Sequence, residues 1–441
     1  MPATAATATA APAAAADAAD SHNVTGAQVT RLRNGMRVVT ETLPWARSVA
    51  VGVRVGVGGR DEPDELAGAS HFLEHLLFKG TETRTAAEIA EAVERVGGEM
   101  NAHTGREDTA YYTRLPAGHL DLGLDILADV VLGPALRASE VDAERQVILE
   151  ELAMDEDSHE DRVFTLVADA LYPGHALGRE VAGTRRTIEA MDRGEIAGFH
   201  ARWYRPANLV VAAAGALDHG EVVAAVERRF GRVEGGEGPG RTAPTRHPRP
   251  LAVVRRRSEQ VHLAIGTRAL SKYDPDRWAL DVADQILGGG TASRLFQTVR
   301  EQRGLAYSVY TSTAEWSDAG ELVVYAGTAL ARFDEVLRLV GAELARFAAD
   351  GPTETELEVA KGYLEGALLL STESVAGTMS AIGRSMINHD AVISVEEHVA
   401  RFQAVTVADV RRVVERILAG PRSIAVVGPV ARRDVERALT A

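Results

Sequence analysis

The sequence of 441 residues contains no cysteine. Disulfide bonds, thiolate metal sites and cysteine nucleophiles are therefore excluded, and any bound metal ion would need His, Asp or Glu ligands. The sequence also lacks an apolar run long enough to span a membrane as a helix. With 46% hydrophobic and 25% charged residues, the composition is that of a soluble globular protein.

Acidic residues outnumber basic residues, and lysine is scarce. Lysine occurs only three times, and 63 acidic residues against 48 Lys and Arg give a net charge of −15. A surface with this charge repels phosphate backbones and anionic lipid head groups. The sequence therefore predicts neither a nucleic-acid partner nor a membrane-surface partner.

The N-terminal segment is rich in alanine and low in complexity, and no Lys or Arg precedes Arg31. A secretory signal has a basic n-region and a mitochondrial presequence has arginines, so neither is predicted. We expect residues 1–25 to form a disordered tail. The scarcity of lysine beside abundant arginine and alanine is typical of a GC-rich bacterial genome. With no export signal, the expected location is the bacterial cytoplasm.

The length of the chain predicts more than one domain. Residues 234–250 are dense in Gly, Pro and charge, which is typical of a linker. The predicted strands and helices follow a similar order on both sides of this segment, which indicates a duplicated α/β unit. We therefore predict one half over residues 26–233 and a second, homologous half over residues 251–441.

The two halves can be aligned without gaps at two predicted helices. Residues 71–80 align with residues 281–290, and residues 139–151 align with residues 355–367. At the aligned positions, the first half has the His and Glu residues of the metal motif, and the second half lacks them. The aligned pairs are His71 with Asp281, Glu74 with Asp284, His75 with Gln285 and Glu151 with Ala367. We expect only the first half to carry metal chemistry.

Residues 70–80, SHFLEHLLFKG, place two histidines four residues apart with a glutamate between them. Residues i and i+4 of a helix project side by side, so His71 and His75 can bind one Zn²⁺. Glu74 lies on the same broad face, where it can accept a proton from a metal-bound water. The alternative is a pair of surface histidines with a salt-bridge partner. The apolar neighbours argue against it, because they predict a buried helix in which ionisable residues need partners.

A carboxylate on another element is expected to be the third ligand. The helix predicted at about 138–154 offers Glu144 and Glu151, which are two turns apart on one face, and Glu150 on a different face. A solvated acidic helix is the ordinary interpretation of such a stretch. Apolar residues along this segment make it amphipathic instead, and its residues alone leave Glu150 as a competitor of Glu151.

These motifs resemble the insulinase/pitrilysin family of zinc metallopeptidases, which includes the β subunit of the mitochondrial processing peptidase. H-x-x-E-H is the inverted zincin motif, and ERQVILEE follows it at residues 144–151. The resemblance extends over nearly the whole chain from about residue 28. It includes residues 98–112, HALGREVAGT (175–184) and GGGTASRLFQTVREQRGLAYSV (288–309).

The resemblance assigns the site residues of the first half. The family's acidic ligand follows the second histidine by about 76 residues, and Glu151 follows His75 by 76. The resemblance thus selects Glu151 over Glu150 as the third ligand of one Zn²⁺ per chain. It makes Glu74 the general base and Glu144 a carboxylate that orients a ligand imidazole.

The resemblance also implies where a substrate binds. Arg300 and Tyr307 match the family's Arg/Tyr pair, which the ligand-free half supplies to hold the substrate backbone and stabilise an oxyanion; without the family match, a salt bridge and a core tyrosine would be preferred. Residues 101–112 resemble the edge strand to which a peptide adds as a further strand. Asn101 and Ala102 are the nearest matches, and His103 is a pocket or core residue instead of a ligand.

The implied fold is α+β, with two homologous α/β halves that form a clamshell-like chamber. Each half is expected to have a mixed or antiparallel sheet with helices on one face. The implied function is a zinc endopeptidase acting on peptides or unfolded polypeptides, as a homodimer or paired with a related subunit. The alternative is a non-catalytic or partner-dependent subunit of a processing-peptidase-like complex. Retention of both the metal motif and the Arg/Tyr pair argues against a scaffold without activity.

Overall fold

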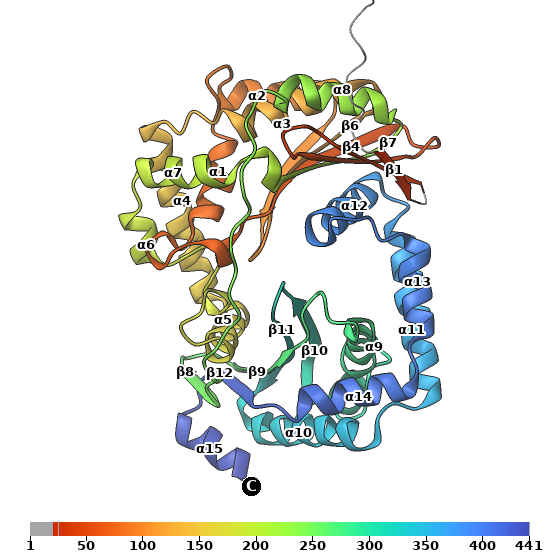
Figure 1. Cartoon of the computed structure of the whole chain (residues 1–441). Coiled ribbons are helices and arrows are strands. Elements are labelled where there is room, and N and C mark those ends of the chain that lie inside the picture. The colour runs from red at the N-terminus through yellow and green to blue at the C-terminus, as the bar shows by residue number, and fades with distance from the viewer. Residues whose placement is uncertain (1–20, 25, 441) are drawn as a thin grey trace, which may run out of the picture.

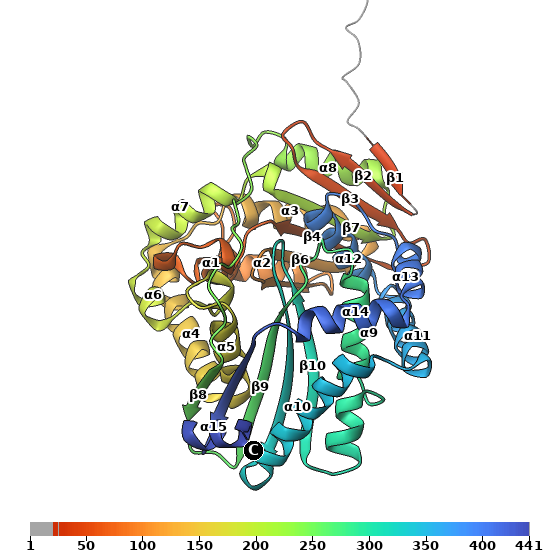
Figure 2. The same cartoon turned by 60° about the horizontal axis from the view of Figure 1, so that its bottom comes forward.

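The computed structural model describes residues 21–24 and 26–440. Two β-sheets lie toward opposite ends of the molecule, and helices pack against them and connect them along two sides (Figure 1). A rotated view shows the long strands of the second sheet rising toward the first sheet (Figure 2). The predicted α+β fold class, with two sheets and many helices, is confirmed.

The first sheet has seven strands in the order β1-β2-β3-β7-β4-β6-β5. These strands are β1 (Ser21–Val24), β2 (Ala27–Arg31), β3 (Arg37–Thr42), β4 (Ser48–Val55), β5 (Glu99–Thr104), β6 (Thr109–Pro116) and β7 (Leu209–Gly215). Strand β7, LVVAAAG, is buried along its whole length, as expected for a central strand covered on both faces. Strand β5 ends the sheet, and among the described residues it pairs with β6 alone.

The second sheet has five strands in the order β10-β11-β9-β12-β8. These strands are β8 (Leu251–Arg255), β9 (Gln260–Ala269), β10 (Ala306–Glu315), β11 (Gly320–Ala329) and β12 (Arg422–Gly428). Counted from β5 and from β10, both sheets have three antiparallel pairings followed by one parallel pairing. This shared topology confirms the duplicated unit.

The helices repeat in the same way. Those of the first half are α1 (Ala69–Leu77), α2 (Ala86–Glu94), α3 (Leu120–Leu132), α4 (Ala138–Asp157), α5 (His159–Leu171), α6 (Arg185–Ala190), α7 (Arg193–Trp203) and α8 (His219–Phe230). Those of the second are α9 (Arg277–Leu287), α10 (Phe333–Asp350), α11 (Glu354–Ser371), α12 (Val375–His389), α13 (Val395–Ala404), α14 (Val407–Leu418) and α15 (Arg432–Thr440). Helices α1 and α9 end at aligned residues, Leu77 and Leu287, and α4 and α11 begin at aligned residues, Ala138 and Glu354.

Two helices are exchanged between the halves. Helix α12 of the second half packs on the first sheet, where Met379 and Ile382 join the apolar side chains of β3, β4 and β7. Helix α5 of the first half packs on β8, β9 and β12 of the second sheet (Figure 1). Each sheet thus carries helices of its own half on one face and a helix of the other half on the opposite face.

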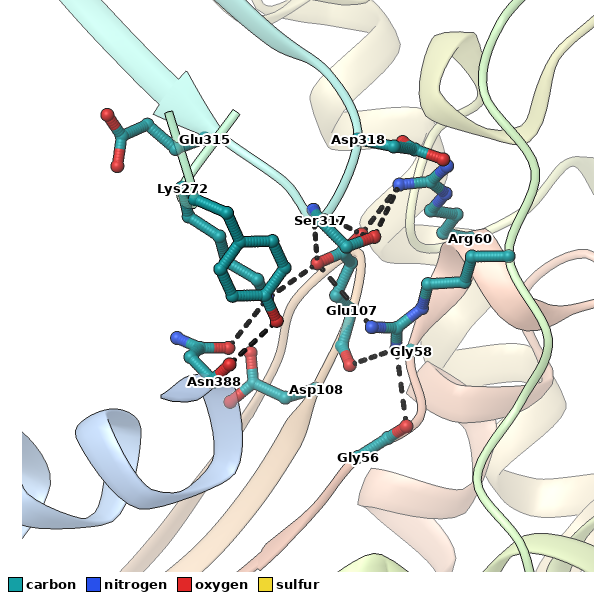
Figure 3. A network of polar contacts seen from close by, with 12 residues as sticks. Gly56, Gly58, Arg60, Glu107, Asp108, Lys272, Glu315, Ser317, Asp318 and Asn388 are labelled. Carbon is teal, nitrogen blue, oxygen red and sulfur yellow. Dashed lines mark hydrogen bonds and ion pairs between the residues drawn. The ribbon is translucent and has the colours of Figure 1, made fainter. Parts of the chain in front are cut away.

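A buried polar network joins the halves at Glu107, in the turn between β5 and β6 (Figure 3). Arg60 of the first half donates to one oxygen of Glu107 at 2.6 Å, and Lys272 of the second half donates to the other at 2.8 Å. The backbone N–H of Ser317, in the turn between β10 and β11, donates to both oxygens at 3.0 Å. The equivalent hairpin turns of the two sheets therefore meet at one carboxylate.

The segment predicted to be a linker takes part in this network. Arg241 donates to both oxygens of Asp61 at 2.8 Å and to the backbone oxygen of Glu107 at 2.7 Å. Burial opposes ionisation of Glu107, but Arg241 and Lys272 prevail and lower its pKa to about 2. The backbone oxygen of Arg246 accepts a hydrogen bond at 2.6 Å from Arg268 of β9 in the second half. The segment over residues 234–250 is thus tied to both halves, while the predicted boundaries at 233 and 251 stay predictions.

The N-terminal region differs from the sequence prediction at residues 21–24. These residues form β1, which pairs antiparallel with β2, instead of belonging to a disordered tail over residues 1–25. An unpaired sheet edge offers backbone N–H and C=O groups that accept another strand with little regard to its side chains, so composition is a poor guide here. The remainder of that segment, residues 1–20 and 25, lies outside the described residues. Within residues 21–24 and 26–440, no helix is long and apolar enough to cross a bilayer.

Candidate metal centre

Helix α1 carries the H-x-x-E-H motif, and a buried carboxylate fixes its first turn. Glu62, which is 5% exposed, accepts hydrogen bonds from the backbone N–H groups of Gly68 and Ser70, each at 2.7 Å. The first N–H groups of a helix lack intrahelical acceptors. Gly68 has φ +99°, and a Cβ there would lie 2.7 Å from the backbone oxygen of Ala182. The start of α1 therefore depends on two residues outside the motif.

Opposite faces of α1 have different environments. One face is core, and its side chains are at most 1% exposed: Phe72, Leu73, Leu76 and Leu77. The other face presents His71, Glu74 and His75, all of which are partly exposed. Packing of the apolar face thus fixes the direction in which the three polar side chains project.

Three donor groups converge beside α1. Nε2 of His75 and Nε2 of His71 lie 3.5 and 3.8 Å from the same carboxylate oxygen of Glu151 on α4. One ligand atom from each residue lies within 4.8 Å of the other two. Ligand atoms of a tetrahedral zinc ion at about 2.0–2.1 Å are separated by about 3.4 Å. The donor set and its spacing fit zinc, and the competitor Glu150 is exposed instead.

Protonation favours metal binding at this cluster. Burial and the neighbouring His75 lower the pKa of His71 to about 4. The imidazole of His71 is therefore neutral at pH 7 and has a lone pair available to a metal ion.

Glu144 contacts the cluster from behind. It is 4% exposed, and its Oε2 lies 3.1 Å from Nδ1 of His75. Its other oxygen lies 2.6 Å from Nζ of Lys79. A hydrogen bond at Nδ1 fixes the imidazole so that Nε2 points toward Glu151. The carboxylate predicted to orient a ligand imidazole thus contacts His75.

Glu74 faces a different partner. The hydroxyl of Thr104, the last residue of β5, donates a hydrogen bond to Oε2 of Glu74 at 2.5 Å. Burial raises the pKa of Glu74 above the usual value, with the Thr104 hydrogen bond opposing that shift. Glu74 is therefore a carboxylate beside the three donors that is held by the edge strand instead of by the cluster.

The predicted substrate-strand residues lie on β5, the edge strand that contacts α1. Asn101 is exposed, and its side-chain oxygen accepts the backbone N–H of Ala102 at 2.8 Å. Ala102 packs against the core of the first half. His103 is exposed on the face opposite Ala102 and Thr104, and it lines a pocket.

Arg300 and Tyr307 contact each other in the second half. The guanidinium carbon of Arg300 lies 4.8 Å from the centre of the Tyr307 ring. Tyr307 is 79% exposed and lies where the β10–β11 register shifts, as in a β-bulge that redirects a side chain. Arg300 lies in the π-helical turn Phe296–Glu301, and within the described chain no carboxylate is within 4.0 Å of it. The alternative of a core tyrosine with a salt-bridged arginine is therefore wrong.

The family models match both halves of the chain. Residues 37–185 match Insulinase (Peptidase family M16), and residues 190–364 match the Peptidase M16 inactive domain. An uncharacterized zinc protease of Mycobacterium tuberculosis is 45% identical over 408 residues, covering 91% of this chain and 92% of the relative. This chain belongs to the M16 peptidase family. An uncharacterized zinc protease of Bacillus subtilis is 35% identical over 90% of this chain and 97% of its own length.

Two solved bacterial structures share the fold. A protease from Helicobacter pylori superposes with a TM-score of 0.85 at 23% identity, covering 91% of this chain and 99% of that one. A Pseudomonas fluorescens structure described as a peptidase M16 inactive domain superposes with a TM-score of 0.86 at 22% identity, covering 92% of this chain and 98% of that one. The predicted insulinase-family membership is confirmed, and M16 relatives of this chain carry the name zinc protease.

Several contacts of the centre were not predicted from the M16 motifs. Glu62, Lys79 and Thr104 each make a hydrogen bond or ion pair that fixes α1, Glu144 or Glu74. The position of Lys79 could have been noticed in the sequence, because it lies four residues after His75 in the same motif and is one of only three lysines. The contacts of Glu62 and Thr104 depend on turns and strand ends that the motif does not specify.

Proposed function

We propose that this M16 protein is a zinc-dependent endopeptidase acting on peptides or unfolded polypeptides. One zinc ion per chain would be held by His71, His75 and Glu151. The observation that supports this most directly is the approach of both Nε2 atoms to one oxygen of Glu151. Glu74 lies beside these donors, held by Thr104, and would exchange the proton.

Zinc held by His71, His75 and Glu151 would supply Lewis acidity toward a water molecule and the scissile carbonyl. Glu74 accepts a proton from the attacking water on a carboxylate oxygen and delivers it to the departing amine nitrogen. Glu144 keeps the His75 ring oriented through Nδ1, with Lys79 balancing its charge. Thr104 keeps the Glu74 carboxylate turned toward the edge of β5.

The substrate backbone would add as a strand along β5, at Asn101, Ala102 and His103. Arg300 would hold that backbone, and the Tyr307 hydroxyl would donate to the oxygen that becomes negative during attack. The exposure of Tyr307 and the lack of a carboxylate beside Arg300 in the described chain support these roles. We further propose that the chain works as a homodimer or with a related subunit.

Glu74→Gln tests the proposal directly. The variant is expected to retain zinc, measured by elemental analysis, and to lose cleavage of a fluorogenic peptide. His71→Ala is expected to lose the metal itself. If Glu74→Gln cleaved peptides at most of the wild-type rate, the assignment of the base would be wrong. The wild-type chain is also assayed after zinc loading and size-exclusion chromatography. If neither the monomer nor the dimer cleaves peptides, the alternative of a non-catalytic or partner-dependent subunit is favoured.

A further inference from the structure

A pocket of about 310 Å³ lies between the first sheet and α12. Its lining includes Tyr112 and Met379 together with three basic side chains, Arg54 of β4, His103 of β5 and Arg384 of α12. Helix α12 comes from the second half and lies on the side of the first sheet that faces the rest of that half (Figure 1). Both halves therefore build this pocket.

Two guanidinium groups in the pocket converge on one hydroxyl. Arg384 donates to Oγ of Ser380 at 2.8 Å, and Arg54 donates to the same oxygen at 3.4 Å. Asp108 pairs with Arg54, whereas no carboxylate of the described chain lies within 4.0 Å of Arg384. Two cations thus share one counter-ion, in a protein whose net charge is −15.

Arg384 is accessible from the pocket. The pocket walls partly desolvate its guanidinium, and this desolvation and the neighbouring Arg54 lower the pKa of Arg384, with Asp108 opposing that shift. An arginine side chain nevertheless stays charged in proteins. A carboxylate in the pocket would supply the missing counter-ion and accept hydrogen bonds from a guanidinium in the geometry that arginine favours.

The corresponding place on the second sheet is closed. Strands β7 and β12 both end at a glycine with positive φ, Gly215 at +127° and Gly428 at +156°. Matching these two glycines through the strand pairings places Arg54 opposite Gly266. A Cβ at Gly266 would lie 2.8 Å from Leu171 of α5. Helix α5 therefore packs directly on its sheet where the first sheet has an arginine and a pocket.

Aromatic side chains fill the rest of the second site. The same register makes Tyr325 the counterpart of Tyr112. The Tyr325 ring lies 4.9 Å from Tyr310 and 5.5 Å from Phe164, measured between ring centres. The duplicated unit thus has this space open and basic in one copy and packed with aromatic rings in the other.

We propose that this pocket binds the side-chain carboxylate of an acidic residue of the substrate, close to the scissile bond. The inference rests on the proposed peptidase function, because a peptide on β5 is what delivers the side chain. Alternate side chains of an added strand point to the face that carries His103. The next residue, Thr104, contacts Glu74 from the other face. The pocket is therefore within a residue or two of the reacting carbonyl.

The test uses fluorogenic peptides that differ by one Glu or Gln, placed in turn at each position around the cleaved bond. At one position the wild-type enzyme is expected to prefer Glu about tenfold in kcat/KM, the effect of about one charge-assisted hydrogen bond. Arg384→Gln is expected to bring that ratio to about one, and Arg384→Glu to favour Lys over Gln there. Arg338→Gln makes the same charge change on an exposed face of α10 and is expected to keep the preference.

Binding separates this proposal from the peptidase proposal. The same peptides are titrated against the full-length Glu74→Gln variant by fluorescence anisotropy, with and without Arg384→Gln. Tighter binding of the Glu peptide that depends on Arg384 supports the pocket even if no peptide is cleaved. Cleavage with no Glu preference at any position overturns the pocket while leaving the peptidase intact. Arg384-dependent binding that needs a free peptide C-terminus and is equal for the Glu and Gln peptides identifies the terminal carboxylate as the ligand and overturns the side-chain proposal.

Discussion

The hydroxyl of Thr104 donates a hydrogen bond to Glu74 across 2.5 Å, which ties the edge strand to the proposed general base. Because Thr104 ends β5, a peptide that adds to this strand would lie next to the carboxylate that is proposed to carry a proton from water to the departing amine. Strand geometry and base orientation are thus coupled through one side chain.

Thr104→Val is expected to lower kcat about tenfold while zinc content stays at the wild-type level. The isosteric change removes a charge-assisted hydrogen bond, and a base released from its orientation loses efficiency. Thr104→Ser, which keeps the hydroxyl, is the control and is expected to retain most activity. Equal rates for Thr104→Val and wild type would show that this contact does not position Glu74.

Glu144→Gln is expected to weaken zinc binding about 10- to 100-fold, because the outer partner of a ligand imidazole contributes about that much. Competition with a fluorescent chelator measures the affinity. Glu150→Gln removes the same charge from an exposed neighbour of Glu151 on the same helix and is expected to bind zinc like the wild type. Similar losses in both variants would point to overall charge instead of the contact with His75.

Glu107→Gln is expected to lower the melting temperature at pH 7, because it leaves Arg60 and Lys272 buried without their shared counter-ion. The pKa of Glu107 is about 2 in the folded protein and about 4.3 in an unfolded chain. A lowered pKa stabilises the fold above the unfolded value, here by about 3 kcal/mol. That contribution is lost as the pH falls from about 4 toward 2.

The pH dependence provides the check on Glu107. Melting curves of wild type and Glu107→Gln are expected to differ most at neutral pH and to approach each other between pH 4 and 2.5. Glu91→Gln, which removes the exposed partner of Arg95, serves as the control and is expected to change the melting temperature little. A constant difference across this pH range would contradict the assigned role of Glu107.

Gly68→Ala is expected to destabilise the start of α1 and reduce zinc retention. Its φ of +99° is costly for any residue with a Cβ, and the added methyl would lie 2.7 Å from the oxygen of Ala182. Gly198→Ala, on α7 with no atom near its Cβ position, is a matched control expected to be neutral or slightly stabilising. Zinc content after dialysis and the melting temperature are the measurements.

Chelation tests the metal independently of catalysis. Removal of zinc with a chelator is expected to lower the melting temperature of the wild type, because a ligand of the folded state stabilises it by mass action. His75→Ala is expected to melt at the same temperature with and without chelator. A chelator effect of wild-type size in that variant would place the stabilising metal elsewhere.

Local sequence patterns were sufficient to predict much of the metal centre and the matching helices of the two halves. The i, i+4 histidines and the seven-residue spacing of Glu144 and Glu151 predicted which side chains share a helix face, and those faces meet between α1 and α4. The gapless alignment of the halves predicted matching helix ends because both copies obey the same packing pattern. Family spacing was needed to choose Glu151 over Glu150.

Contacts between distant segments could not be predicted in this way. Glu62 and Thr104 act on α1 through a loop and a strand end, and neither has a periodicity that shows in the sequence. The pocket at Arg54 and Arg384 joins β4 to a helix more than three hundred residues later. The pocket follows from the placement of α12 on the first sheet, which short-range patterns do not encode.

The exchange of α5 and α12 between the halves determines how the protein behaves if the chain is cut between them. A protease that cleaves within residues 234–250 would leave α5 on the second sheet and α12 on the first, so the two fragments would remain clasped together. Any opening of the molecule would likewise have to bend the chain on either side of these helices, for example at Ser158 between α4 and α5. The parts that move as units are therefore not the parts that are continuous in sequence.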